Sequence, residues 1–354
     1  MTNLEKYLSL LGDEIDGLLL TSRYSRHYGA QFDIAEGVAI VTKAGCRYYT
    51  DSRYIESAEN NLRGFDVRMV GKGRGYYEQL NEAIADFQVH SLGYEENYLT
   101  VAEFTGYEKH LNAALVPYSG KINHFRGAKE AWELERMRKA QEITDAAFTE
   151  VLPRLHTGMT ELQAQAELIY CLYKNGAQGL SFDPIVVSGP NTSMPHGVAG
   201  ERVIQDGDFL TMDFGVLYQG YCSDMTRTVA FGHVTEEMER VYNIVAAAQR
   251  VGIAASKAGV LGREVDAAAR KVIADVGYGE YFGHGYGHSV GLEVHELPSV
   301  GGSAENVMVE NAVASAEPGI YLPGKFGVRI EDVVVYKPGG VENLTHSPKN
   351  LIIL

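Results

Sequence analysis

The stretch MDFGVLYQGYCSDMTRTV, residues 212–229, carries the first indication of both fold and chemistry. Aromatic and β-branched residues flank a short glycine-containing turn, which predicts a β-hairpin. A turn centred on Tyr218 and Gln219 would place Asp213 opposite Asp224 on one face. Two carboxylates that close repel each other, so they need a shared proton or a cation, and a divalent ion bound through oxygen meets that need. Taken alone, the hairpin favours two ordinary aspartates in solvent.

A histidine cluster follows in FGHGYGHSVGLEVHE, residues 282–296. His284, His288 and His295 lie among glycines, which let the backbone approach an ion or a ligand closely. One histidine is more often structural than functional. Three at spacings of four and seven residues, in a chain that also offers carboxylates, favour chemistry.

Two glutamates complete the set of candidate metal ligands. Glu317 precedes a proline, which favours extended backbone, and Glu331 lies in an alternating strand pattern on the same face as Arg329. The five candidates follow one another along the second half of the chain, each in a predicted strand or tight loop. They predict a carboxylate-rich dinuclear metal site and therefore a metallohydrolase; in chain order they are Asp213, Asp224, His288, Glu317 and Glu331.

In these motifs the chain closely resembles the M24 metallopeptidases. Within that family it is most similar to the proline-specific branch, the Xaa-Pro aminopeptidases and Xaa-Pro dipeptidases. Five motifs carry the resemblance: SGPN through PHG at 188–197, the hairpin, the histidine cluster, AEPG at 316–319, and VRIED at 328–332. It covers roughly residues 128–354, with a looser match upstream. It implies an α+β protein in which a C-terminal pita-bread (creatinase/aminopeptidase) domain, residues 128–354, follows a smaller α/β N-terminal domain, residues 1–127.

The resemblance also implies roles for individual residues. It makes Asp213, Asp224, His288, Glu317 and Glu331 the ligands of two divalent ions, and it makes His196, His284, His295, Glu317 and Arg329 catalytic. Four carboxylates and one imidazole form a hard ligand set that suits manganese, the expected metal, with cobalt or zinc as alternatives. The pair His284 and Arg329 matches the proline-specific branch and is generally missing from methionine aminopeptidases. The implied reaction is hydrolysis of the Xaa-Pro bond at the N-terminus of peptides or in dipeptides, by a metal-bridging water or hydroxide.

Several alternatives stay open at this stage. The same fold also carries methionine aminopeptidases, non-peptidase hydrolases or lyases, and catalytically silent binding modules. The sequence does not separate a dipeptidase from an aminopeptidase. The family usually has glycine where this chain has Ser289, a change that could tighten the loop or add a hydroxyl near the metal.

Two short patterns suggest other chemistry and are rejected. GHSVG at 287–291 matches the G-x-S-x-G turn of serine hydrolases. The segment that follows is too short for the required helix, because Pro298 interrupts it. GIYLPGKF at 319–326 begins like a phosphate-binding loop, yet ends in Phe326 where Ser or Thr would hold magnesium.

Composition narrows the class of partner. The 354 residues carry a net charge of −15, which disfavours nucleic acid and anionic membrane as partners. No stretch has the length of a membrane span, and acidic residues interrupt the first twenty residues, so we expect no signal peptide. Three widely spaced cysteines indicate reduced thiols and a cytoplasmic location. The family resemblance adds the expectation of a homodimer.

Helix signals organise the second domain. An apolar face from Leu134 to Val151 predicts a long helix at about 129–152, and Thr160 opens a capping box before a helix that Asn175 and Gly176 end. Further helices are expected to begin near Thr235 and Gly262. In the first domain, residues 17–21, 37–41 and 48–51 are predicted strands.

Overall fold

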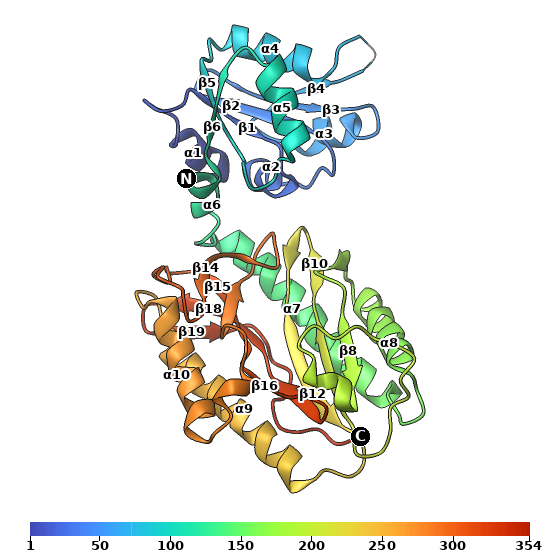
Figure 1. The fold of residues 1–354 in the computed structure, drawn as a ribbon. Helices are drawn as coiled ribbons and strands as arrows, with labels where there is room; N and C mark the ends of the chain where they lie inside the picture. The colour runs from blue at the N-terminus through green and yellow to red at the C-terminus, as the bar shows by residue number, and fades with distance from the viewer. Residues whose placement is uncertain (72) are drawn as a thin grey trace. The chain divides into compact units, whose positions relative to one another are not determined.

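The computed structural model describes residues 1–71 and 73–354, and the chain divides into two compact units, Met1–Arg126 and Gly127–Leu354 (Figure 1). Each unit has its own buried core, so each is described by itself. Across the described parts of the chain, no helix combines the length and apolarity that a membrane span requires.

The first unit is an α/β domain around one mixed sheet. In the part of the chain that the structure describes, this sheet has six strands in the order β4-β3-β2-β1-β5-β6, with β1 antiparallel to β2 and parallel to β5. The apolar runs at the centre are fully buried, as expected for strands covered on both faces. The strands are β1 (Gly17–Leu20), β2 (Val38–Thr42), β3 (Cys46–Thr50), β4 (Asp66–Met69), β5 (Ser91–Tyr94) and β6 (Ala114–Pro117). All three predicted strands are confirmed within a few residues.

Short capped helices flank this sheet. Thr2 and Thr100 each form a capping box that satisfies the free N–H groups of a helix start. The helices are α1 (Asn3–Leu8), α2 (Arg23–Ala30), α3 (Ile55–Asn61), α4 (Tyr76–Asp86), α5 (Val101–His110) and α6 (Ser119–His124).

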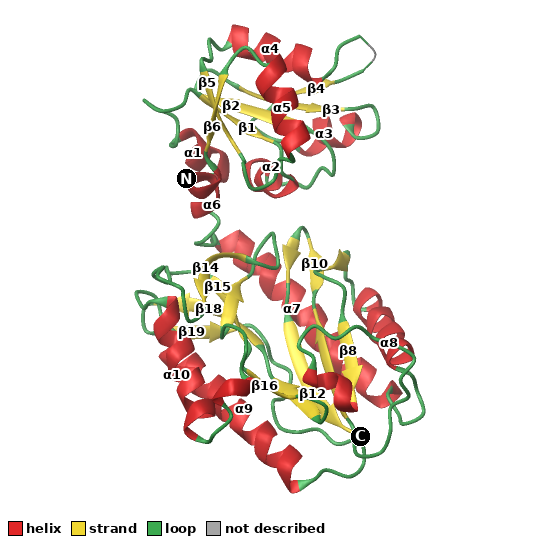
Figure 2. Ribbon diagram, in the orientation of Figure 1, coloured by secondary structure: helices red, strands yellow, loops and turns green. Residues whose placement is uncertain are grey.

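The second unit encloses its strands between two helix pairs (Figure 2). The pairs are α7 (Ala131–Val151) with α8 (Glu161–Lys174), and α9 (Glu236–Ala255) with α10 (Gly262–Asp275). The predicted capping box at Thr160 and the helix starts at Thr235 and Gly262 are confirmed. Together with the first unit this is the expected α+β architecture, a creatinase/prolidase-type N-terminal domain followed by a pita-bread domain.

Strands of this unit form several small sheets. Among the described residues these are β12-β9-β8, β11-β10-β7, β14-β13-β15-β18-β19 and the hairpin β16-β17. The strands on the α7/α8 side are β7 (Gly179–Leu180), β8 (Ile185–Ser188), β9 (Phe209–Phe214), β10 (Val216–Tyr218), β11 (Tyr221–Cys222) and β12 (Met225–Ala230). The remaining strands are β13 (Gly287–Ser289), β14 (Glu296–Val300), β15 (Val313–Ala316), β16 (Gly319–Leu322), β17 (Phe326–Arg329), β18 (Asp332–Lys337) and β19 (Gly340–Asn343).

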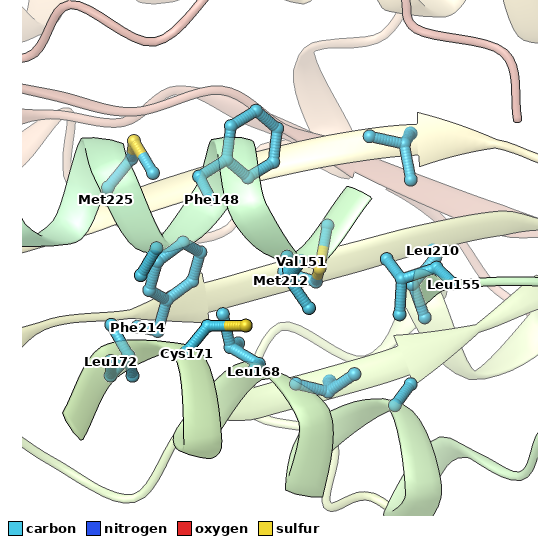
Figure 3. Close-up of a cluster of buried hydrophobic side chains, with 14 of the residues drawn as sticks. Phe148, Val151, Leu155, Leu168, Cys171, Leu172, Leu210, Met212, Phe214 and Met225 are labelled. Carbon is cyan, nitrogen blue, oxygen red and sulfur yellow. The ribbon is translucent and has the colours of Figure 1, made fainter. Parts of the chain in front are cut away.

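An apolar cluster fixes the α7/α8 pair on the sheet that carries the first candidate ligand. Phe148 and Val151 of α7 pack with Leu168 of α8 against Met212 and Phe214 of β9 (Figure 3). Met212 and Phe214 flank Asp213 and point into this core, so alternation along the strand sends the Asp213 side chain to the opposite face. Core packing therefore determines the direction of the carboxylate.

Candidate active site

A cavity of about 770 Å³ within the second unit gathers every residue for which the sequence predicts a role. Apolar and polar groups share its walls, as in most small-molecule sites. Its lining comprises Phe182, Ile185, Pro195, His196, Asp213, Asp224, Gly283, His284, Gly285, Gly287, His288, Val294, His295, Glu317, Arg329 and Glu331. The five candidate ligands thus converge from four separate segments of the chain.

The register predicted for the hairpin is wrong by two residues. Gln219 and Gly220 both have positive φ, 47° and 82°, and form the turn in place of Tyr218 and Gln219. Asp213 consequently pairs with Thr226, not with Asp224. Asp224 follows β11, where the paired strands β10 and β11 give way to β9 and β12, and its carboxylate still reaches the same cavity.

The carboxylates present unsatisfied oxygens to the cavity. Oδ1 of Asp213, Oδ1 of Asp224 and Oε1 of Glu331 are buried and find no hydrogen-bond donor among the described residues. Buried acceptors are normally satisfied because leaving one unpaired costs about 1–3 kcal/mol. A cation that binds these oxygens would remove this cost, so the residues fit a metal site.

Burial and mutual repulsion raise the pKa of two of these acids. The pKa of Asp224 lies well above its usual value because the carboxyl is desolvated and lies near Asp213 and Glu317. The pKa of Glu331 is raised well above its usual value by desolvation and by Asp224. Opposite charge would reverse both shifts, and a divalent cation supplies it.

His288 faces this acidic group through a single nitrogen. Its Nδ1 lies 3.3 Å from the Ser289 carbonyl, which fixes the ring proton on Nδ1. Burial lowers the pKa of the imidazole. The free lone pair of Nε2 then points at Oε1 of Glu317, 3.3 Å away, and Oδ2 of Asp224, 3.6 Å away. Acceptors that face one another need a proton or a cation between them. Asp224, His288 and Glu331 could hold such a cation, because they offer ligand atoms within 4.8 Å of one another.

A second network joins His284 to Arg329 through Tyr321, which sequence reasoning missed. The buried Arg329 donates from Nη2 to Oδ2 of Asp213 at 2.6 Å and from Nη1 to the Tyr321 hydroxyl at 2.8 Å. The Tyr321 hydroxyl lies 2.8 Å from Nε2 of His284, whose Nδ1 lies 2.9 Å from the Gly285 carbonyl. Nδ1 therefore holds the proton, and Tyr321 donates to Nε2. Burial raises the pKa of Tyr321 to about 12, so the hydroxyl keeps its proton at neutral pH.

Two glycines make room for the Tyr321 ring. A Cβ at Gly319 would lie 2.4 Å from the Tyr321 hydroxyl, and one at Gly327 would lie 2.9 Å from the ring. The β16-β17 register pairs Gly319 with Arg329 and Tyr321 with Gly327. Alternation in an antiparallel hairpin places all four on one face, so a hairpin prediction for 319–329 would have found Tyr321.

The other two histidines line the cavity differently. The His295 ring packs edge-on against His288 with ring centroids 4.0 Å apart. Desolvation, with the neighbouring His288 and His196, lowers the pKa of His295 to about 4, so the ring is neutral at pH 7. His196 is exposed at the cavity wall.

Ser289 neither enters the cavity nor acts as a nucleophile. Its side chain is fully buried, and its hydroxyl donates to the Pro298 carbonyl at 2.5 Å. This bond ties β13 to β14, so the serine tightens the strand pair that carries His288. No helix follows Ser289 in the described chain, as G-x-S-x-G chemistry would require.

Fold and site together define a metallohydrolase: a pita-bread domain with one imidazole and four carboxylates around a cavity. Residues 135–338 match the metallopeptidase family M24, and residues 3–127 match the creatinase/prolidase N-terminal domain. The chain belongs to metallopeptidase family M24 and is a metallopeptidase.

Relatives and solved structures agree along the whole chain. A Bacillus subtilis protein described as "uncharacterized peptidase YqhT" is 38% identical over 99% of both chains, and a Pyrococcus horikoshii Xaa-Pro dipeptidase is 35% identical over 96% of this chain and 95% of its own. The structure of a Xaa-Pro dipeptidase from Bacillus anthracis superimposes with a TM-score of 0.95 at 40% identity, covering 99% of each chain. An X-Pro aminopeptidase from Thermotoga maritima gives a TM-score of 0.93 at 35% identity and the same coverage.

Proposed function

We propose that this protein is a dinuclear-metal peptidase that hydrolyses the Xaa-Pro bond, with Xaa-Pro dipeptides as its preferred substrates. The observation that carries the proposal is the His284–Tyr321–Arg329 network, which ends on the candidate ligand Asp213. It joins the two residues typical of the proline-specific branch to the metal cluster. Similarity to proteins named Xaa-Pro dipeptidase supports the choice of dipeptides.

Asp213, Asp224, His288, Glu317 and Glu331 would hold the two ions. Divalent ions bound there lower the pKa of water and polarise the scissile carbonyl. Arg329 orients the Asp213 carboxylate by a charge-assisted hydrogen bond of 2.6 Å. Ser315 orients Glu317, whose Oε1 accepts the Ser315 hydroxyl at 3.1 Å.

The remaining cavity residues bind the peptide and move protons. His295, neutral at pH 7, donates a ring N–H to the substrate carbonyl as negative charge develops there. His196, on the exposed wall of the same cavity, also hydrogen-bonds the substrate and helps to stabilise the tetrahedral intermediate. Glu317, which the family resemblance makes a proton shuttle, accepts a proton and passes it to the leaving proline nitrogen.

An aminopeptidase that accepts longer Xaa-Pro peptides is the second candidate, favoured by the similarity to the Thermotoga maritima enzyme. The less favoured alternatives are a methionine aminopeptidase, a non-peptidase hydrolase or lyase, and a catalytically silent binding module. We further expect a cytoplasmic homodimer that uses manganese, with cobalt or zinc as substitutes.

The test is hydrolysis of Ala-Pro, Ala-Pro-Ala-Ala and Met-Ala-Ser, followed by mass spectrometry, with protein stripped by chelator and reloaded with manganese, cobalt or zinc. Metal-dependent release of alanine from Ala-Pro alone is the expected result. Release from Ala-Pro-Ala-Ala would assign the aminopeptidase, and release of methionine from Met-Ala-Ser would assign a methionine aminopeptidase. Cleavage of none by metal-loaded protein would reject a peptidase of this specificity.

A further inference from the structure

The segment that carries His284 has little regular structure of its own. Residues 282–286 lie between the short helix η3 (Gly279–Tyr281) and β13, outside any helix or strand. Gly283 and Gly285 flank His284, and a side chain at Gly283 would meet nothing within 4 Å. Glycine leaves the backbone freest to move, so the direction of His284 depends on what holds the neighbouring peptide groups.

Two residues of α10 hold the peptide groups around His284. The Arg270 guanidinium donates from Nη1 to the Phe282 carbonyl and from Nη2 to the His284 carbonyl, both at 2.7 Å. The Asp266 carboxylate accepts the Tyr286 N–H at 2.9 Å. We call Asp266 and Arg270 the α10 clamp.

The clamp is rigid because its own members are tied together. Arg270 and Asp266 form two hydrogen bonds of 2.9 Å, one helical turn apart. The Asp266 side chain is 2% exposed, and the guanidinium lies over the Phe282 ring at 4.2 Å from its centroid. The planar guanidinium has several N–H donors and can therefore bind two carbonyls at once, which a lysine ammonium could not do in the same geometry.

We propose that Asp266 and Arg270 are positioning residues for catalysis, which act by fixing His284 on Tyr321 and so the network that ends on Asp213. The proposal rests on the proposed function. It extends the site by one layer, to a helix whose side chains are absent from the cavity lining. Residues that orient functional groups in this way typically change activity by about 10- to 100-fold when they are replaced.

The decisive variant is Arg270→Met, which keeps the stem over Phe282 and removes the donors. Its matched control is Lys271→Met, because Lys271 and Asp275 form the same i,i+4 ion pair on the same helix, at 2.8 Å, but exposed. Asp266→Asn is the milder second variant: it can still accept the Tyr286 N–H but loses the charge that orients Arg270. Arg270→Lys tests rescue, since an ammonium can reach one carbonyl at a time.

We expect Arg270→Met to lower kcat on Ala-Pro by about 10- to 100-fold with KM changed less than about threefold. Asp266→Asn and Arg270→Lys should fall between Arg270→Met and wild type, and Lys271→Met should match wild type. Hydrogen exchange, read by mass spectrometry on peptides spanning 282–288, gives a readout that needs no activity. It should speed up in Arg270→Met and stay unchanged in Lys271→Met.

The outcomes separate the two proposals. If wild-type protein exchanges slowly at 282–288 but does not cleave Ala-Pro, the proposed function is rejected. The exchange rate of Arg270→Met relative to wild type then decides whether the α10 clamp holds the loop. Active wild type with an equally active Arg270→Met would overturn the clamp, as would faster exchange without loss of kcat. If Arg270→Met does not fold, Asp266→Asn with wild-type kcat and exchange would overturn it equally.

Discussion

The second unit has an α7/α8 half and an α9/α10 half, and in each half a buried helical carboxylate holds a loop. The histidines to which the two loops lead differ in their surroundings. In the first half, the buried Glu161 of α8 accepts the Ser188 N–H at 2.7 Å, and the loop from Ser188 leads to the exposed His196. In the second half, the buried Asp266 of α10 accepts the Tyr286 N–H at 2.9 Å, and the chain continues to His288. A buried helical acid thus fixes a loop on each side of the cavity.

The difference between the halves lies in what surrounds the end of each loop. His288 lies within 3.6 Å of carboxylate oxygens of Asp224 and Glu317, whereas His196 makes no ion pair with a carboxylate among the described residues. We therefore infer that a buried acid holds a loop in both halves, and that the metal ligands come from the second loop and the central strands. The predictions below test this division, in order of decreasing effect.

The largest effect should come from the metal cluster. Glu331→Ala removes a buried carboxylate that offers an unsatisfied oxygen, so we expect loss of bound metal and a fall in kcat/KM of about 10³-fold or more. Metal content by plasma emission spectrometry and Ala-Pro hydrolysis check this. The control is Glu342→Ala, a half-exposed glutamate paired with Arg138 at 2.7 Å. Full metal content in Glu331→Ala would remove Glu331 from the ligand set.

The next effect should come from the neutral histidine beside the cluster. His295→Ala should keep the metal and lower kcat by about 10²-fold, because a hydrogen-bond donor to the developing oxyanion is lost. The same metal assay and steady-state kinetics measure it. Unchanged kcat would exclude His295 from the mechanism.

Tyr321→Phe should give a smaller loss. It removes the hydroxyl that joins His284 to Arg329 and leaves the ring between Gly319 and Gly327. We expect kcat/KM to fall about tenfold, the value of one or two net hydrogen bonds, with metal content unchanged. Tyr278→Phe is a control on a partly exposed tyrosine that does not line the cavity. A wild-type rate in Tyr321→Phe would show that the network does not support catalysis.

Much of this site could be predicted from the sequence, because its ligands sit in short motifs with fixed chemistry. The helix starts followed from caps such as Thr160. The hairpin register could not be predicted, since it depends on which two residues adopt positive φ, and here Gln219 and Gly220 do so. Tyr321 was hidden in a stretch that resembles a phosphate-binding loop, and its role depends on the pairing of β16 with β17.

The loop-holding acid of the first half should affect stability more than chemistry. Both carboxylate oxygens of Glu161 accept hydrogen bonds, from Ser188 and Asn191 on Oε1 and from Gly200 on Oε2. In Glu161→Gln an amide N–H₂ replaces one of these oxygens and cannot accept. We expect the free energy of unfolding to fall by about 1–3 kcal/mol in urea titration, with kcat changed less than tenfold. Glu167→Gln, on the same helix and partly exposed, should stay within about 0.5 kcal/mol of wild type. A larger kcat loss than that of Arg270→Met would reverse the comparison of the halves.

The smallest effect should be the pH dependence of metal-free protein. The pKa values of Asp224 and Glu331 are raised in the folded state by burial and repulsion, so folded protein binds more protons than unfolded protein. Their contribution is present below the unfolded pKa of about 4 and is lost as pH rises through the folded pKa. The Tm of stripped protein should therefore rise by a few degrees as pH is lowered from neutral towards this unfolded pKa, and Asp224→Asn should flatten this slope. A Tm that falls over this range would contradict the assignment.

The central claim is that activity requires metal at the carboxylate–imidazole cluster. The most direct test is titration of stripped protein with manganese, with heat of binding and Ala-Pro hydrolysis recorded on the same samples. We predict binding that saturates at about two ions per chain, activity that rises with occupancy, and neither signal in Glu331→Ala. Full activity in stripped protein, or binding that Glu331→Ala leaves intact, would contradict the account.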